Sequence, residues 1–314
     1  MTHNSLLQQF RFFYFRNYPD DMETQIQYFS IFGGLDITID TTKPLEELIE
    51  HYILQNFTFL NEQIELLTLN MPSHKRLLHA LAKGDRRIFS AFNKAKLNNG
   101  NGGAALNFLE EKGIIQLEYS RETHPKERYP KKKLKREEAR HRISHKVLFT
   151  APFLRFWFYF VLPHTKEIAE KNYTSFFKNF EIKSNSYTSL IFEELSEILL
   201  NYHLRDEIIE SSGSYWDAKT EIDILMTTAK KSIYIGECKW SNHKINKKEL
   251  HKLKDKCEKL HIEPTQIIFF AKRGFSKELQ NLESKALALY SCEDFEVLLK
   301  QKSTHNTQSF IRLT

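Results

Sequence analysis

Cysteine is scarce in this sequence, and the cysteines that are present lie far apart. Cys238, Cys257 and Cys292 share no close spacing. The chain therefore has neither the paired cysteines of a disulfide framework nor the spacing of a zinc site. Because nothing in this pattern requires oxidation, we expect a protein of the reducing cytoplasm.

The sequence also lacks a long apolar run. Its most apolar stretch, FLRFWFYFVLP at residues 153–163, contains Arg155 and is shorter than the roughly 20 residues that span a bilayer. Residues 1–20 have no cationic start followed by an apolar core and a cleavage site, as a signal peptide would. We expect no membrane partner, and a buried helix or strand at 153–163.

A nucleotide phosphate loop is a third absence. The pattern GxxxxGK(S/T) does not occur, and Gly33-Gly34 does not form such a loop. We therefore expect no ATP binding by this chain. The formal net charge is +6, which permits a nucleic-acid partner without requiring one.

The first half of the chain is rich in helical patterns. Residues 1–70 form an N-terminal helical segment that includes a helix at 42–54, with Thr42 as its N-cap. Further helices are predicted at 73–84, 86–97 and 104–113, with a turn at 98–103 and a strand at 114–120. Three short helices followed by a strand are typical of a winged-helix domain, which we place at residues 71–150.

The segment after that strand is strongly basic. Residues 121–148 would form the wing and its return strand, with a cationic cluster at Lys131, Lys132, Lys133, Lys135 and Arg136. Such a cluster gains affinity for DNA by releasing counterions from the phosphate backbone. Two alternatives stay open. The run is an ordinary solvated loop, or the winged helix packs on a neighbouring domain, because its recognition helix carries Glu110 and Glu111.

The second half of the chain is predicted to be an α/β domain. An aromatic helical connector at 151–186 leads to a domain at 187–300, and residues 301–314 form a tail. The pattern predicts a helix at 188–204, strands at 206–210, 221–227 and 232–240, and a helix at 245–262. A buried strand at 265–272 and a last helix with a short strand follow. This order favours a compact α/β fold with a mixed sheet.

Charged residues interrupt the most apolar hairpin of that domain. A turn centred on Lys230 sets position 228 near 232, which places Asp223 opposite Glu237 on one face. Two carboxylates about 5 Å apart repel each other unless a cation lies between them, and Mg²⁺ (or Mn²⁺) suits such ligands. Lys239 would then stabilise charge at a phosphate or activate a water. The alternative is an ion pair between Glu237 and Lys239, with Asp223 facing solvent.

These motifs resemble a known family. Phe192-Glu193, Trp216-Asp217, Glu221-Ile222-Asp223 and Gly236-Glu237-Cys238-Lys239-Trp240 occur in that order. They resemble the PD-(D/E)xK, or restriction-endonuclease-like, nuclease superfamily. More narrowly, they resemble the C-terminal domain attached to archaeal-type AAA ATPases.

The resemblance implies a metal-dependent DNA nuclease with a restriction-endonuclease-like αβββαβ core. Asp223, Glu237 and the Cys238 carbonyl would bind the metal, and Lys239 would complete the catalytic set with Glu193. Helical periodicity instead favours Glu194 over Glu193, so the two residues stay alternatives. YFSIFGGLDITI at 28–39 looks like the end of the ATPase module of that family, whose phosphate loop has no counterpart here.

Two other kinds of function remain open from the sequence. The chain is a non-catalytic DNA-binding or adaptor protein that uses the nuclease-like domain as a scaffold, or it works with a separate ATPase partner. A homo-oligomer is compatible with either. The sequence does not choose between DNA forms.

The basic cluster leads to the first testable expectation. Replacing Lys131, Lys132 and Lys133 together by Glu should weaken binding to all DNA sequences alike, because backbone contacts carry no sequence information. The slope of log affinity against log salt concentration should also become shallower. Fluorescence anisotropy with two unrelated duplexes measures both, and unchanged binding would make the cluster an ordinary solvated loop.

Overall fold

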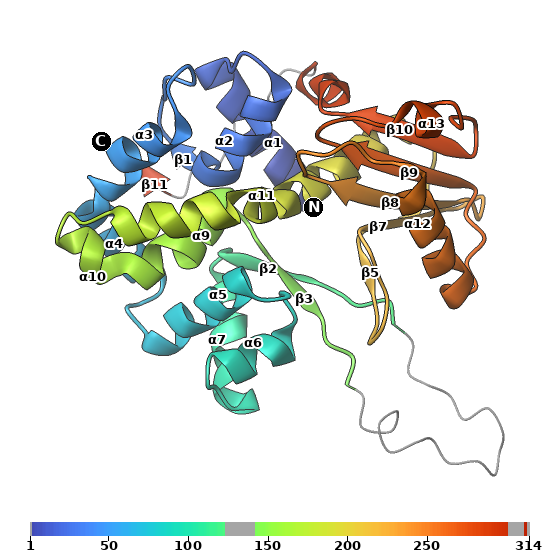
Figure 1. Ribbon diagram of the computed structural model, residues 1–314. Helices are drawn as coiled ribbons and strands as arrows, with labels where there is room; N and C mark the ends of the chain where they lie inside the picture. Colours follow the sequence, from blue (N-terminus) through green and yellow to red (C-terminus); the bar gives the residue numbers. More distant parts are fainter. Residues whose placement is uncertain (1, 123–141, 301–310, 313–314) are drawn as a thin grey trace, which may run out of the picture.

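A computed structural model describes residues 2–122, 142–300 and 311–312 of the chain. The protein is an α/β protein with a helical N-terminal region and a mixed five-stranded sheet in its C-terminal part (Figure 1). The basic cluster at Lys131–Lys133, Lys135 and Arg136 lies outside the described residues.

The helical region begins with four α-helices and one π-helical turn. They are α1 (Thr2–Asn17), α2 (Met22–Phe32), α3 (Leu45–Ile49), the π-helical turn η1 (Glu50–Leu54) and α4 (Phe57–Leu67). The N-cap predicted at Thr42 is wrong, because α3 begins after Pro44 and Thr42 binds Asp40 instead. A short strand, β1 (Leu35–Asp36), pairs in parallel with β11 (Ile311–Arg312) near the C-terminus.

The described residues of the next stretch, 72–122 and 142–149, contain three helices and a two-stranded ribbon, which we call the three-helix unit. They are α5 (Pro72–Lys83), α6 (Ile88–Lys94), α7 (Asn99–Glu111), β2 (Ile115–Glu118) and β3 (Lys146–Phe149). The two strands pair antiparallel, with Ile115 opposite Phe149. The helices and strands predicted for this stretch are therefore present.

The turn predicted at 98–103 is wrong, because these residues begin α7. The Asn98 side chain accepts a hydrogen bond from the Asn101 N–H at 2.8 Å and caps the helix. Gly102 allows a close approach of the Phe92 ring, since a Cβ there would lie 2.7 Å from ring atoms. A cap and one tight contact outweigh the low helix propensity of glycine.

The aromatic run forms buried helical turns, as expected. It comprises α9 (Pro152–Phe156), the π-helical turn η2 (Trp157–Val161) and the short turn η3 (Leu162–His164), followed by α10 (Thr165–Ala169). Phe156, Trp157 and Phe160 have no exposed surface. Among the described residues, no helix is both long and apolar enough to cross a membrane.

A single long helix, α11 (Thr174–His203), connects the helical region to the sheet (Figure 1). Its 30 residues correspond to about 45 Å at the usual rise per residue. The helix begins well before position 188, where periodicity predicted its start, so the expected boundary between residues 186 and 187 falls inside it. Glu193 lies in its second half.

The sheet has five strands in the order β10-β9-β8-β7-β4. These strands are β4 (Ile209–Ser211), β7 (Ile224–Thr228), β8 (Ile233–Lys239), β9 (Gln266–Ala271) and β10 (Leu287–Ser291). Strands β8, β9 and β10 are parallel to one another, whereas β7 is antiparallel to both β8 and β4. The mixed sheet predicted from the sequence is confirmed.

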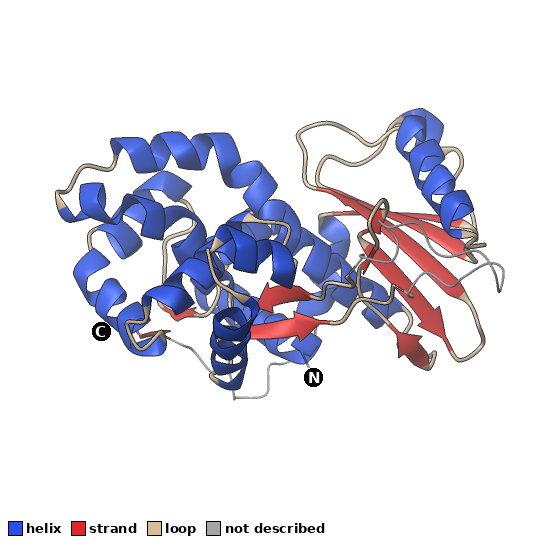
Figure 2. Ribbon diagram, turned by 90° about the horizontal axis from the view of Figure 1, so that it is seen from below, coloured by secondary structure: helices blue, strands red, loops and turns tan. Residues whose placement is uncertain are grey.

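Helices and apolar side chains cover both faces of this sheet. Helix α12 (Lys247–Leu260) follows β8 and lies on one face, where Ile235 and Phe269 pack with Leu253 (Figure 2). On the other face, Tyr234 and Cys238 pack in the core that includes α11. Further short turns are α13 (Lys277–Gln280) and η4 (Glu293–Leu299). Alternation along β8 thus sends its side chains to two separate cores.

The packing of α7 yields a test with two neighbouring glycines. Gly102→Ala should destabilise the protein by about 1–3 kcal/mol, because the new methyl group would overlap the Phe92 ring. Gly103→Ala should instead stabilise it by up to about 1 kcal/mol, since nothing lies within 4 Å of a Cβ there and alanine favours helix. Urea unfolding of the two variants measures the difference. Equal effects would contradict the packing of α7 on α6.

Candidate active site

The strand predicted at 221–227 is interrupted at Asp223. Residues Glu221–Ile222 form β6, which pairs with β5 (Tyr215–Trp216) outside the main sheet, and β7 begins at Ile224. Because of this bend, Ile222 packs in the core on the α12 side, whereas Ile224 packs in the core on the α11 side. Alternation along one continuous strand at 221–227 would place both on one face, so the bend overturns that expectation.

The hairpin register predicted from the turn near Lys230 is nevertheless confirmed, since Ile224 pairs with Gly236. Asp223 lies at the bend just before β7. The Asp223 carboxylate accepts a hydrogen bond from the Cys238 N–H at 2.8 Å. Burial, the charge of Glu193 and the charge of Glu237 raise the pKa of Asp223 to about 8. Asp223 thus does not simply face solvent.

Glu237 is held by two ammonium groups. Lys239 Nζ lies 2.6 Å from Oε1, and Lys256 Nζ from α12 lies 2.8 Å from Oε2. Glu237 is 7% exposed. Burial alone would raise its pKa, but the two lysines lower it below the usual range, so Glu237 is ionised. Burial opposes the charge of Lys239, yet Glu237 outweighs that effect and raises the pKa of Lys239.

Glu193 is the third carboxylate of this cluster. Burial raises its pKa to about 7, the charge of Arg86 opposes that shift, and the charge of Glu221 adds to it. Of the two alternatives on α11, Glu193 is the residue whose charge contributes to the raised pKa of Asp223. Glu194 lines a small cavity with Ser5 and Thr150.

Glu193, Asp223 and Glu237 have the carboxylate oxygens that a divalent cation prefers, but their side chains do not form a ligand group for one ion. Within the part of the chain that the structure describes, no three His, Cys, Asp or Glu side chains form a group that could hold a metal ion. Asp223 and Glu193 both have raised pKa values, so a nearby cation would stabilise their ionised forms. Carboxylate oxygens are ligands that Mg²⁺ prefers. For Cys238, the structure shows its N–H bound to Asp223 and its thiol buried.

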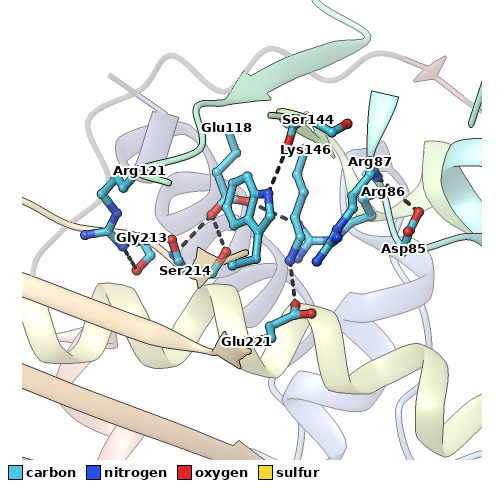
Figure 3. Close-up of polar contacts among 11 residues, drawn as sticks. Asp85, Arg86, Arg87, Glu118, Arg121, Ser144, Lys146, Gly213, Ser214 and Glu221 are labelled. Carbon is cyan, nitrogen blue, oxygen red and sulfur yellow. Dashed lines mark hydrogen bonds and ion pairs between the residues drawn. The ribbon is translucent and has the colours of Figure 1, made fainter. Parts of the chain in front are cut away.

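The three-helix unit packs against β5 and β6, the strands just before Asp223 (Figure 3). Lys146 is 1% exposed, and its Nζ lies 2.5 Å from Glu221 Oε1 and 4.5 Å from the centre of the Trp216 ring. Burial lowers the pKa of Lys146, and the charge of Arg86 lowers it further. The Trp216 indole N–H donates to the Ser144 carbonyl at 2.9 Å. Trp216 is therefore a packing residue and not a free stacking surface.

Arg121, which follows β2, makes further hydrogen bonds between the three-helix unit and the chain around β5 and β7. Its guanidinium donates to the carbonyls of Gly213, Ser214 and Leu225 at 2.6–2.8 Å. Glu118 accepts from the Ser214 hydroxyl at 2.6 Å (Figure 3). The sequence left open whether this unit packs on a neighbouring domain. The structure shows such packing at the ribbon of β2 and β3, which contacts the C-terminal part of the chain.

Sequence reasoning missed three cations around the carboxylates. Lys146 belongs to the basic segment at 121–148, for which a solvated loop was one alternative, yet it is buried against Glu221. Arg86 has a positive φ of 64° on the loop before α6, which no local pattern indicates. Lys256 was the most accessible to prediction, because it lies on the helix predicted at 245–262, one helical turn after the exposed Lys252.

Comparison with models of protein families gives a match for part of the chain. A family model named DUF234, described as archaea bacterial proteins of unknown function, matches residues 157–253. This range contains Glu193, Asp223, Glu237 and Lys239. A search of curated proteins and a search of solved structures gave no match. Residues 157–253 are therefore similar to a domain family whose function is unknown.

Proposed function

We propose that the protein is a metal-dependent DNA nuclease with a restriction-endonuclease-like domain and a winged-helix accessory domain. The observation that carries this proposal is the electrostatic coupling of Asp223 to carboxylates on two other elements. The charges of Glu193 on α11 and Glu237 on β8 both contribute to the raised pKa of Asp223, and Lys239 binds Glu237.

The arrangement of the sheet supports the proposal. Helix α11 is followed by β4, β7, β8, α12 and β9, and the sheet is mixed. This order matches the αβββαβ core that the resemblance to PD-(D/E)xK nucleases implies. Of the resembling motifs, Glu221-Ile222-Asp223 lies at the bend before β7, and Gly236-Glu237-Cys238-Lys239-Trp240 lies at the end of β8.

Asp223 and Glu237, assisted by Glu193, would hold Mg²⁺ or Mn²⁺. Such an ion lowers the pKa of a bound water and neutralises charge at a phosphate. Lys239 is protonated at neutral pH because its pKa is raised, so it acts on the phosphate as a charge and not as a proton acceptor. Glu193 would assist as an ionised carboxylate, because a nearby cation opposes the burial that raises its pKa.

A non-catalytic DNA-binding or adaptor protein is the second candidate, and one observation favours it. Both carboxylate oxygens of Glu237 are already bound by lysines. An ion pair of this kind gives Glu237 a structural role without metal. This chain would then act through its three-helix unit, with or without a separate ATPase partner.

An assay with pure protein separates the two candidates. Single-stranded, duplex and branched DNA are incubated with Mg²⁺, Mn²⁺ or EDTA, and the products are resolved on denaturing gels. We expect metal-dependent cleavage of at least one form that Asp223→Asn abolishes. Asp206→Asn is the matched control, because Asp206 is exposed on the turn after α11. Absence of cleavage in every form would favour the adaptor.

The raised pKa of Asp223 predicts a dependence of stability on pH. Its folded-state pKa of about 8 exceeds the ordinary 3.8, so ionisation of Asp223 destabilises the folded protein as the pH rises from about 4 to 8. Asp223→Asn removes this charge and keeps an acceptor for the Cys238 N–H. At pH 8 the variant should therefore melt a few degrees above the wild type, which corresponds to about 1–2 kcal/mol, and near pH 4 the two should coincide.

Melting curves with and without Mg²⁺ complete this test. The ion should raise the melting temperature of the wild type by mass action and leave Asp223→Asn unchanged. A variant that melts below the wild type at pH 8, with no effect of Mg²⁺ on either protein, would show that Asp223 has a structural role only.

A further inference from the structure

Two lysines from different elements share the Glu237 carboxylate. Lys239 belongs to β8 and Lys256 to α12, and they bind opposite oxygens of Glu237 at 2.6 and 2.8 Å. The side chain of Glu237 is 9% exposed, whereas those of Lys239 and Lys256 are 35% and 30% exposed. The carboxylate is thus inside the site, and the two lysine side chains reach its surface.

The charges of the site are separated between its interior and this surface. Glu193 and Asp223 are both partly buried and lie within electrostatic reach of each other, which favours a cation nearby. At the surface, two ammonium groups share one carboxylate, which leaves one positive charge in excess. A phosphate oxygen next to a divalent cation satisfies both requirements at once.

The position of Lys256 on α12 distinguishes it from the other lysines of that helix. Leu253 and Cys257 point into the core against the sheet, and Lys256 lies at the edge of that buried face. Lys252, one turn earlier, is 68% exposed and pairs with Glu249. Lys247 pairs with Glu278, on the segment after β9.

We propose that Lys256, together with Lys239, binds a phosphate oxygen of the DNA strand that enters the site. The inference rests on the proposed nuclease function, because it takes DNA as the ligand. Lys256 is then a substrate-binding residue contributed by α12, in addition to the residues of the hairpin motif. Its ammonium group moves from Glu237 Oε2 to the phosphate, and that carboxylate oxygen becomes available within the site.

Three variants test this role: Lys256→Gln, Lys256→Arg and, as control, Lys252→Gln on the same helix. DNA binding is measured by fluorescence anisotropy in EDTA over a series of salt concentrations, and cleavage is measured in Mg²⁺. Lys256→Gln should weaken DNA binding several-fold and reduce the slope of log affinity against log salt by about one contact. KM should rise more than kcat falls. Lys256→Arg should retain the wild-type slope, and Lys252→Gln should change it little.

The outcomes separate this inference from the function on which it rests. If the wild type cleaves DNA and Lys256→Gln keeps the wild-type slope and KM, Lys256 is only an ion-pair partner of Glu237 and the inference fails alone. A lower melting temperature with an unchanged slope leads to the same conclusion. If the wild type binds DNA without cleaving it, a reduced slope in Lys256→Gln still supports the phosphate contact. If the wild type neither binds nor cleaves any DNA form, both proposals fail.

Discussion

The bend at Asp223 is the constraint on which the rest of the C-terminal part depends. At this residue the chain leaves the pairing of β6 with β5 and enters β7 of the main sheet. The Cys238 N–H, donated from the adjacent strand, holds the carboxylate at 2.8 Å. This hydrogen bond holds a partly buried acid beside the Cys238 backbone and within electrostatic reach of Glu193 and Glu237. Its raised pKa is the electrostatic consequence of that placement.

The same bend also connects the site to the three-helix unit. Because β6 departs from the sheet, Glu221 meets the buried ammonium of Lys146, and Trp216 on β5 packs beneath it. Burial of the Lys146 ammonium costs desolvation, which its ion pair with the half-exposed Glu221 and its contact with the Trp216 ring offset only in part. Loss of Glu221 would leave the buried charge of Lys146 alone. The site and the three-helix unit are therefore joined by polar contacts that require both parts to be correctly placed.

Much of this arrangement followed from local patterns in the sequence. Alternation and the turn near Lys230 gave the register of the hairpin, since a short hairpin allows few pairings. The five-stranded sheet followed from apolar runs that alternate with helices. Local patterns also indicated that the aromatic run is buried.

The remaining features depend on contacts between distant residues. The break at Asp223 accompanies the pairing of β6 with β5, where Trp216 lies opposite Glu221. Alternation within one strand contains no sign of this pairing. The start of α7 depends on packing against Phe92, although its glycines suggest a turn. Lys146 is separated by 75 positions from Glu221, so its burial could not be read from a basic segment. Lys256 approaches Glu237 only once α12 lies on the sheet.

The central claim is that Asp223 is a partly buried carboxylate that a divalent cation stabilises. The most direct test is the pH titration of the Asp223 side-chain carboxyl by ¹³C NMR, assigned with the Asp223→Asn variant, with and without Mg²⁺. Without metal, the resonance should titrate near pH 8, and Mg²⁺ should move its midpoint to clearly lower pH. A midpoint near 4, as for an ordinary aspartate, with no response to Mg²⁺ would contradict the claim.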